Sequence, residues 1–388
     1  MKLSCLKWAA LLPLILNLNA CFPQNSINLS VSIPLTGPEA PRGQSIVNAL
    51  LLAVEEINQS GGIAGNTISL NIRDHRGDPT LARENSRDLL KLNSKGLFFL
   101  AGAEISQEIL PHYLEKKLLV LAPGRIQLEN PGTAHGIMQN LANPDQEAQS
   151  LINYLVKSGY KRFAIVTEPE SLFARALQKA YQRQLNFFQL KTVSQIIQNS
   201  EPSLKNIQNL LENETEVILY AGGYSGAAQW AQNLSNLNLN LVLAGPQDLF
   251  DKEFIRQAGK SNVQNVLTVF PDMETPEEFS KKYRSRFGET SPLATLTYLS
   301  AHQLFTALKA SPQAPEVFLS AQKFSPGQAF LHPPMARLPE NYLVLWQPDS
   351  LGQFKKLPSP QRPLLQKSGI LLGEKGRNRV QKRPAAKR

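Results

Sequence analysis

Short apolar runs alternate with longer segments of helical periodicity along most of the chain. Residues 29–33 form an apolar run that stops at Pro34, and residues 44–58 follow with apolar positions at helical spacing before Gly61 and Gly62. These two patterns predict a strand and then a helix. The order repeats downstream, with strands expected at 68–72, 97–100 and 118–121 and helices expected at 78–92 and 105–116.

The alternation restarts after about residue 139. Strands and helices of these lengths are typical of βα units, which form parallel sheets covered by helices on both faces. Two such sheets in series predict an α/β protein with two lobes. The second series has expected helices at 144–158, 171–185, 202–211, from 225, 276–287 and 292–310, expected strands at 163–166, 190–193, 217–220, 241–243 and 266–269, and a late hairpin of 342–346 with Phe354.

Composition fits a globular protein, because 42% of the 388 residues are hydrophobic and 19% are charged. The length suggests about two domains. The net charge of +10 lies mainly near the ends, since residues 373–388 carry seven basic side chains against one acidic and Lys2 and Lys7 add two more. The body is close to neutral, so no nucleic-acid partner is expected. Residues 358–388 lack an apolar period and predict a disordered basic tail.

The N-terminus has the pattern of a targeting segment. Two lysines precede an apolar run at 8–18, which is too short to span a bilayer, and residues 1–20 are expected to form a signal peptide. Leu18-Asn19-Ala20-Cys21 is similar to the bacterial lipobox, which predicts lipidation of Cys21 and a tether at 21–26. The protein would then be lipid-anchored in the bacterial cell envelope, facing the periplasm or the exterior. The alternative is an ordinary secretory signal with an incidental cysteine.

Catalytic patterns are absent from the sequence. The five histidines and two cysteines show no metal-ligand spacing, and no Gly-rich phosphate loop occurs. Residues 223–227 lack the last glycine of a nucleophile elbow. We therefore expect no enzyme, no cofactor and no metal, with an enzyme that uses scattered carboxylates as the minor alternative.

Several short motifs follow one another in a familiar order over residues 27–352. They are IPLTGP at 33–38, AVEEIN at 53–58 with GGIAG at 61–65, Asp78-Pro79, GGY at 222–224, Gly245-Pro246 and YLVLW at 342–346. With these motifs the chain resembles the branched-chain amino-acid (Leu/Ile/Val)-binding type of periplasmic binding protein, which serves ABC importers.

The resemblance implies a fold and a division of the chain. It implies two flavodoxin-like (Rossmann-like) lobes with parallel sheets, joined by a three-strand hinge, with the ligand cleft between them. Residues 27–140 with 270–330 would form one lobe, and residues 141–269 with 331–352 would form the other.

Ligands of open parallel sheets bind beyond the carboxyl ends of the strands, where loops and helix N-termini present backbone N–H groups. The loops expected to line the cleft are 34–43, 102–106, 122–126, 167–173, 221–225 and 245–248. The candidate ligand-binding residues in these loops are Arg42, Ser106, Gly124, Arg125, Phe173, Tyr224, Gln247 and Asp248.

The loops depart from the pattern of the family. Ser106 remains as the donor expected for a ligand carboxylate, and Gln247 stands where the family has an acid that pairs with a ligand ammonium. Asp248 is either that ammonium partner or a helix cap. Arg42 and Arg125 either grip an anionic ligand through paired hydrogen bonds or point to solvent at the cleft rim.

The expected function is that of an extracytoplasmic solute-binding lipoprotein of an ABC transporter, which captures an amino acid or a related small polar or anionic solute by hinge closure. Its partners would be the solute, the ABC permease subunits and the membrane through the lipid anchor. The alternative is an envelope lipoprotein of the same fold that acts through protein contacts, as a regulator or an activator of cell-wall synthesis. The altered pocket and the basic tail motivate that alternative.

Overall fold

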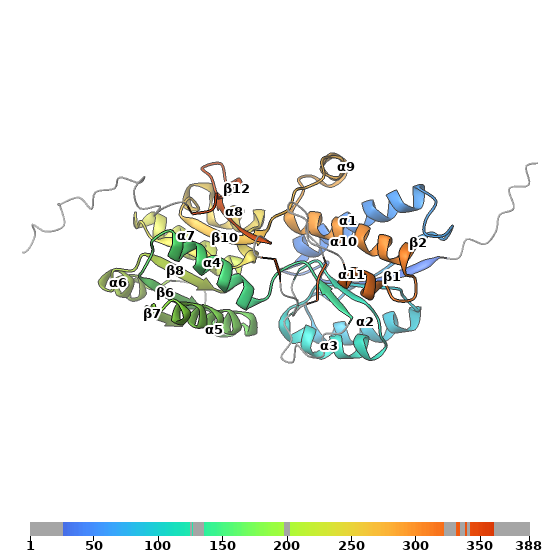
Figure 1. Ribbon diagram of the computed structural model, residues 1–388, viewed down its shortest axis with the longest axis horizontal. Helices are drawn as coiled ribbons and strands as arrows, with labels where there is room; N and C mark the ends of the chain where they lie inside the picture. The colour runs from blue at the N-terminus through green and yellow to red at the C-terminus, as the bar shows by residue number, and fades with distance from the viewer. Residues whose placement is uncertain are drawn as a thin grey trace, which may run out of the picture.

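The computed structural model describes residues 26–124, 126, 136–197, 202–321, 331–333, 338–339 and 342–360. The chain forms two α/β lobes side by side along the long axis of the molecule, as the sequence predicts (Figure 1). Cys21, the expected signal peptide, Arg125 and the part of the expected tail beyond residue 360 lie outside the described residues.

The sheet of the first lobe has the strand order β2-β1-β3-β4-β5, and all its strand pairs are parallel. Alternate residues of β1 and β3 point to opposite faces, so Leu29 and Phe98 pack on one side and Leu97 and Phe99 on the other. The strands are β1 (Ile27–Ile33), β2 (Ile68–Asp74), β3 (Leu97–Phe99), β4 (Val120–Ala122) and β5 (Ile137–Gln139).

Helices cover both faces of this sheet. Helices α1 and α10 pack together on the face that carries Leu29, and α2 and α3 cover the face that carries Phe99. Helix α9 packs on α1 and α10 through Phe279 and Tyr283. The helices are α1 (Ala40–Gln59), α2 (Pro79–Leu89), α3 (Ala103–Glu115), α9 (Glu277–Phe287), α10 (Pro292–Ala310) and α11 (Pro315–Ser320).

The sheet of the second lobe has the order β12-β11-β10-β9-β8-β6-β7. Its pairs are parallel except at one edge, where β11 runs antiparallel to β10 and to β12. That edge is the hairpin expected late in the sequence. The strands are β6 (Phe163–Thr167), β7 (Thr192–Ile197), β8 (Val217–Ala221), β9 (Val242–Gly245), β10 (Val266–Pro271), β11 (Leu343–Pro348) and β12 (Phe354–Lys356).

Helices also cover both faces of the second sheet. Helices α4 and α5 pack with Phe163 and Leu219 on one face, and α6, α7 and α8 pack with Val166 and Tyr220 on the other. Figure 1 shows α4 and α5 along the side of this lobe that faces the viewer. The helices are α4 (Pro144–Lys157), α5 (Leu172–Phe187), α6 (Leu204–Glu212), α7 (Tyr224–Asn236) and α8 (Lys252–Ala258).

The chain crosses between the lobes after β5, after β10 and before β11. The first two crossovers meet in an apolar cluster that includes Leu141, Phe270 and Leu296. The third is described only at residues 331–333 and 338–339. It is joined to the first by backbone hydrogen bonds in which Gln139 and His332 each donate to the other's carbonyl, at 2.8 and 3.0 Å.

Most of the expected elements are confirmed, with some differences at the margins. The weak strand expected at 190–193 lies at Thr192–Ile197 instead. Strand β5 and helices α8 and α11 were not foreseen. Helices α8 and α11 span only 7 and 6 residues, too few for a helical apolar period to show. Strand β5 has only two apolar residues, whereas the equally short β3 and β4 lie within apolar runs of four or more.

Candidate ligand cleft

A cavity of about 310 Å³ lies where the loops at the carboxyl ends of second-lobe strands face the first turn of α1. The first lobe contributes Glu39 and Arg42, so side chains of both lobes meet in the same cavity. The remaining lining residues belong to the second lobe and are Glu168, Ser171, Phe173, Gly222, Gly223, Tyr224, Ser225, Gly226 and Asp248. Of the sequence-predicted residues, Arg42, Phe173, Tyr224 and Asp248 therefore line one cavity.

The first turn of α1 is held tightly against the end of β1. A Cβ atom on Gly43 would lie 1.8 Å from the Pro34 carbonyl oxygen, so only glycine permits this approach. The loop between β1 and α1 is also fixed by Asp74, whose carboxylate accepts from the Leu35 backbone N–H at 2.8 Å and from the Thr36 hydroxyl at 2.7 Å. These contacts position Arg42 at the cleft.

Arg42 forms an ion pair across the cleft. Its guanidinium donates to Asp248 Oδ1 of the second lobe at 3.2 Å and to Glu39 Oε2 of its own lobe at 3.3 Å. The side chains of Arg42 and Asp248 are only 21% and 18% exposed, so water screens the pair only in part. Arg42 and Asp248, both expected to bind a ligand, are thus paired with each other in this conformation.

The charges around Arg42 shift pKa values. Burial works against the charge of Arg42, but the neighbouring carboxylates of Asp248 and Glu39 raise its pKa overall. Asp251 lies nearby, and burial raises the pKa of its carboxyl group although Arg42 acts in the opposite direction. Asp251 also caps α8, because its carboxylate accepts from the Glu253 backbone N–H at 2.8 Å.

Glu168 is a cleft residue that the sequence reasoning missed. Its carboxylate accepts from the Tyr220 hydroxyl at 2.5 Å and from the Gly223 backbone N–H at 2.9 Å, at the start of α7. Glycine makes room for it, since a Cβ atom on Gly226 would lie 2.2 Å from Glu168 Oε1 and one on Gly222 2.6 Å from Glu168 Cδ. Burial and the Glu168 carboxylate together raise the pKa of Tyr220.

A signal for Glu168 does exist in the sequence. It is the first residue after an apolar strand, in a loop expected to line the cleft, and the glycines at 222, 223 and 226 follow the adjacent strand. Glycines opposite an acid that directly follows the neighbouring strand, as Glu168 does and Glu170 does not, indicate that the acid occupies the space that they leave.

The other predicted residues that the structure describes, Gln247, Ser106 and Gly124, are not among those that line the cavity. Gln247 is 1% exposed, and its side-chain amide exchanges two 3.2 Å hydrogen bonds with the backbone of Ala142 in the first crossover. Ser106 is buried, and its hydroxyl donates to the Ala101 carbonyl at 3.4 Å. The Gly124 carbonyl accepts from the Leu141 backbone N–H.

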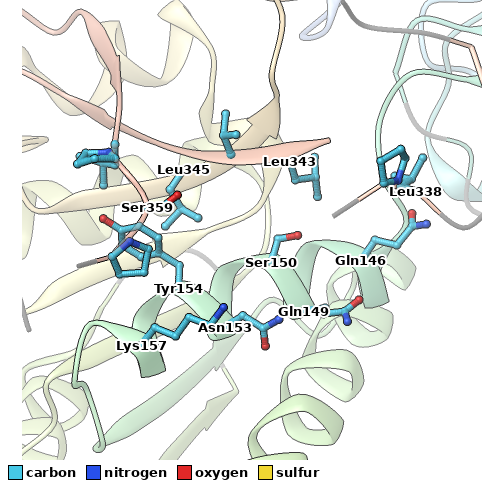
Figure 2. A pocket seen from close by; sticks show the side chains of 15 residues that line it. Gln146, Gln149, Ser150, Asn153, Tyr154, Lys157, Leu338, Leu343, Leu345 and Ser359 are labelled. Atoms are coloured by element: carbon cyan, nitrogen blue, oxygen red, sulfur yellow. The ribbon is translucent and has the colours of Figure 1, made fainter. Parts of the chain in front are cut away.

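A larger hollow, of about 450 Å³, lies elsewhere on the second lobe. Figure 2 shows it along α4, beneath β11, with Gln146, Ser150 and Asn153 on the helix side. We call it the α4 groove. Its lining residues are Gln146, Gln149, Ser150, Asn153, Tyr154, Lys157, Leu338, Pro339, Leu343, Val344, Leu345, Leu357, Pro358, Ser359 and Pro360.

The described residues offer neither a metal site nor a membrane-spanning helix. Among the described residues, no group of three or more His, Cys, Asp or Glu side chains could hold a metal ion. No helix in the described part of the chain is both long and apolar enough to cross a membrane.

Two α/β lobes joined by crossovers, with a cavity at the carboxyl ends of the strands, are the architecture of two-lobed solute-binding proteins. The sequence profile of the family described as Periplasmic binding protein matches residues 26–322. The chain belongs to the periplasmic binding protein family, whose members are solute-binding proteins.

Curated relatives carry Leu/Ile/Val-binding names. The Leu/Ile/Val-binding protein BraC3 of Rhizobium johnstonii is 26% identical over 236 residues, which are 59% of this chain and 63% of the relative. The match thus spans less than two thirds of the length of BraC3. Leu/Ile/Val-binding protein homolog 1 of Brucella melitensis is 24% identical over 298 residues, covering 73% of this chain and 78% of the relative.

Solved structures share the fold. The branched-chain amino acid transporter substrate-binding protein LivJ of Streptococcus pneumoniae, in complex with isoleucine, gives a TM-score of 0.71 at 16% identity and covers 85% of this chain and 98% of that one. The leucine-binding protein LivK of Thermotoga maritima gives 0.70 at 16% identity, with 86% and 98% covered. At this identity the likeness establishes the two-lobed fold.

Proposed function

We propose that this protein is an extracytoplasmic solute-binding protein of an ABC transporter, which captures an amino acid or a related small polar solute in the cleft. The observation that carries the proposal is the cavity lined by Arg42 of the first lobe and by strand-end residues of the second. A solute in this cavity contacts both lobes at once. The Leu/Ile/Val-binding names of the relatives and the isoleucine in the pneumococcal complex support an amino-acid ligand.

Capture proceeds by closure of the lobes about the crossovers. The lobes in this proposal are residues 27–140 with 270–330, and residues 141–269 with 331–352. A ligand shifts the population toward the closed form only if some of its contacts exist in that form alone. The Arg42–Asp248 pair already bridges the lobes, so the ligand has to replace this contact or add to it.

An anionic solute has less support than the sequence suggested. That option rested on Arg42 and Arg125. Arg42 is already paired with Glu39 and Asp248. Arg125 lies outside the described residues and contributes no geometry.

The membrane partner and the location complete the proposal. A lipid on Cys21 keeps the protein in the bacterial envelope, facing the periplasm or the exterior, beside its permease subunits. Anchoring raises the local concentration of binding protein at the importer without a new contact. We expect Cys21→Ala to move the protein from the membrane fraction to the soluble fraction. Membrane retention of that variant would contradict the lipid anchor.

The function is tested by a thermal-shift screen of the full chain against amino acids, small amides, dicarboxylates and aromatic acids. A ligand at about 100 times its Kd stabilises the folded form by about 2.7 kcal/mol, which is a readily measured increase in Tm. We expect one chemical class to raise Tm. A flat response across the panel would remove the solute-binding function.

A second candidate function is an envelope lipoprotein that acts through protein contacts, as a regulator or an activator of cell-wall synthesis. The specific observation in its favour is that polar groups in and beside the cleft satisfy one another, as in the Arg42–Asp248 pair and the Gln247–Ala142 hydrogen bonds. This candidate predicts the flat response in the same screen.

A further inference from the structure

Among the described residues, the lining of the cleft cavity carries more negative than positive charge. It includes the carboxylates of Glu39, Glu168 and Asp248 and, of the described basic side chains, the guanidinium of Arg42. Arg42 contacts both Glu39 and Asp248, so its charge is already shared between two carboxylates. Within the described part of the chain, Glu168 pairs with no lysine or arginine.

Glu168 also occupies the place that would otherwise attract an anion. The N-terminus of a helix presents free backbone N–H groups and a positive dipole end, which together bind phosphates and carboxylates. At the start of α7 the Gly223 N–H donates to Glu168, a carboxylate of the chain itself. An anionic ligand would have to approach this carboxylate, and repulsion between like charges opposes that.

Aromatic rings complete the lining. Phe173 and Tyr224 face the same cavity as the carboxylates. The face of an aromatic ring attracts an ammonium or guanidinium group, and the attraction increases as the cation is desolvated. Carboxylates and ring faces in one cavity favour a positively charged ligand group and offer little to a negative one.

We infer that the cleft takes a small organic cation, a solute with a net positive charge on ammonium or guanidinium groups. Glu168 and Asp248 contact the cation, and Phe173 and Tyr224 pack against its carbon atoms. This inference rests on the proposed solute-binding function and specifies its substrate class.

The test uses two probes with the same four-carbon skeleton and opposite charge, 1,4-diaminobutane and succinate. Arginine and leucine extend the comparison to a cationic and a neutral amino acid. Each is titrated into the full chain, purified in non-ionic detergent, by isothermal calorimetry. We expect 1,4-diaminobutane or arginine to bind at least tenfold more tightly than succinate and leucine. Added salt should weaken the binding of the cation, because it screens the partly exposed carboxylates.

Glu168→Gln tests the carboxylate directly. The amide keeps an oxygen that can accept from Gly223 but loses the charge, so we expect the cation to bind about tenfold or more weakly. Glu212→Gln, at an exposed position of α6, is the matched control and should leave binding unchanged. Asp248→Asn is the second variant. It removes one of the two carboxylates that pair with Arg42, and should weaken binding of the cation and strengthen binding of succinate. Thermal melts establish that each variant is folded.

The outcomes distinguish failure of the cation inference from failure of the solute-binding function. Tighter binding of succinate than of 1,4-diaminobutane overturns the inference, and so does an unchanged cation affinity in folded Glu168→Gln and Asp248→Asn. Binding of leucine alone also overturns it but leaves the solute-binding function standing. The absence of heat with all four probes, joined to a flat thermal-shift screen, removes both.

Discussion

The cleft and the α4 groove differ in what they bring together. The groove is the larger hollow, about 450 Å³ against about 310 Å³. Its lining, however, comes from α4, β11 and nearby segments, and consists of aliphatic side chains, prolines, amides and hydroxyls; among the described residues Lys157 is its one charged group (Figure 2). The cleft is lined from both lobes, and four of its lining side chains are charged.

The difference shows that the origin and charge of the lining identify a binding site better than volume does. Gathering charges in a partly buried space costs free energy unless they are paired or have a partner that is present only part of the time. A groove formed beside one helix of one lobe needs no such explanation. The cleft is therefore the site whose perturbation should matter, and the predictions below contrast it with the rest of the molecule.

The largest effect is expected from pH, acting on the crossovers beside the cleft. His332 is buried there, and this burial lowers its pKa from 6.5 to about 4. The unfolded chain therefore binds the proton more readily than the folded chain. The free energy of unfolding should fall as pH drops from about 6.5 to about 4 and level off below that, by up to about 3 kcal/mol from this group.

The measurement is urea unfolding of the full chain at several pH values. His332→Asn keeps a donor near the Pro333 carbonyl, which the His332 ring contacts at 2.9 Å, and should make the profile shallower in this window. Some slope should remain, because burial also lowers the pKa values of His75 and His302. His112→Asn, at an exposed position of α3, should keep it. A His332→Asn profile as steep as that of the wild type would contradict the assignment.

The next effect is expected at Gly226, which leaves room for the half-buried side chain of Glu168. A Cβ atom there would lie 2.1 Å from the Tyr220 hydroxyl oxygen, so Gly226→Ala displaces Tyr220 or Glu168. We expect a loss of about 2 kcal/mol in the free energy of unfolding. Gly223→Ala is the control, because its nearest neighbour would be 3.8 Å away and its φ of −82° suits alanine; since alanine is a poorer N-cap than glycine, it should cost up to about 1 kcal/mol. Equal melting temperatures for the two variants would contradict this account.

The ion pair across the cleft should have a smaller effect. Arg42→Ala removes this ion pair between the lobes and takes the guanidinium away from Asp248 and Asp251. Because the pair is partly exposed, we expect a loss of about 1 kcal/mol, measured by chemical unfolding. Arg256→Ala breaks a pair with Glu253 within α8, in which the arginine is 72% exposed, and should change stability less. A larger loss for Arg256→Ala would contradict the stabilising role of the Arg42–Asp248 pair.

The sequence predicted the fold because the signals for it are repeated and local. Each strand of the core is an apolar run of a few residues, and helices such as Pro292–Ala310 show both a start signal and an apolar period. Strand β5 is not predicted from the sequence, because its short segment, Ile137–Gln139, gives no recognisable apolar pattern. Their place is set by neighbouring strands, which is information about the folded chain.

The candidate site was predictable only in part, for a related reason. Which loops end at the cleft follows from strand order, so Arg42, Tyr224 and Asp248 could be named from the sequence. The pairing of Arg42 with Asp248 joins residues 206 positions apart and depends on how the lobes meet. Gln247 likewise bonds to Ala142 across 105 positions. Sequence spacing contains no information about such contacts.

The smallest effect is expected from a substitution in the α4 groove. Ser150 lies on the groove side of α4 (Figure 2), and Ser150→Trp places a large ring in the hollow. Because none of the residues that line the cleft also lines the groove, solute affinity should stay within about twofold of the wild type, and stability within about 0.5 kcal/mol, as is usual for surface substitutions. Calorimetry with the solute that responds in the thermal-shift screen measures the affinity. Loss of solute binding in folded Ser150→Trp would move the functional site to the groove and reverse the comparison.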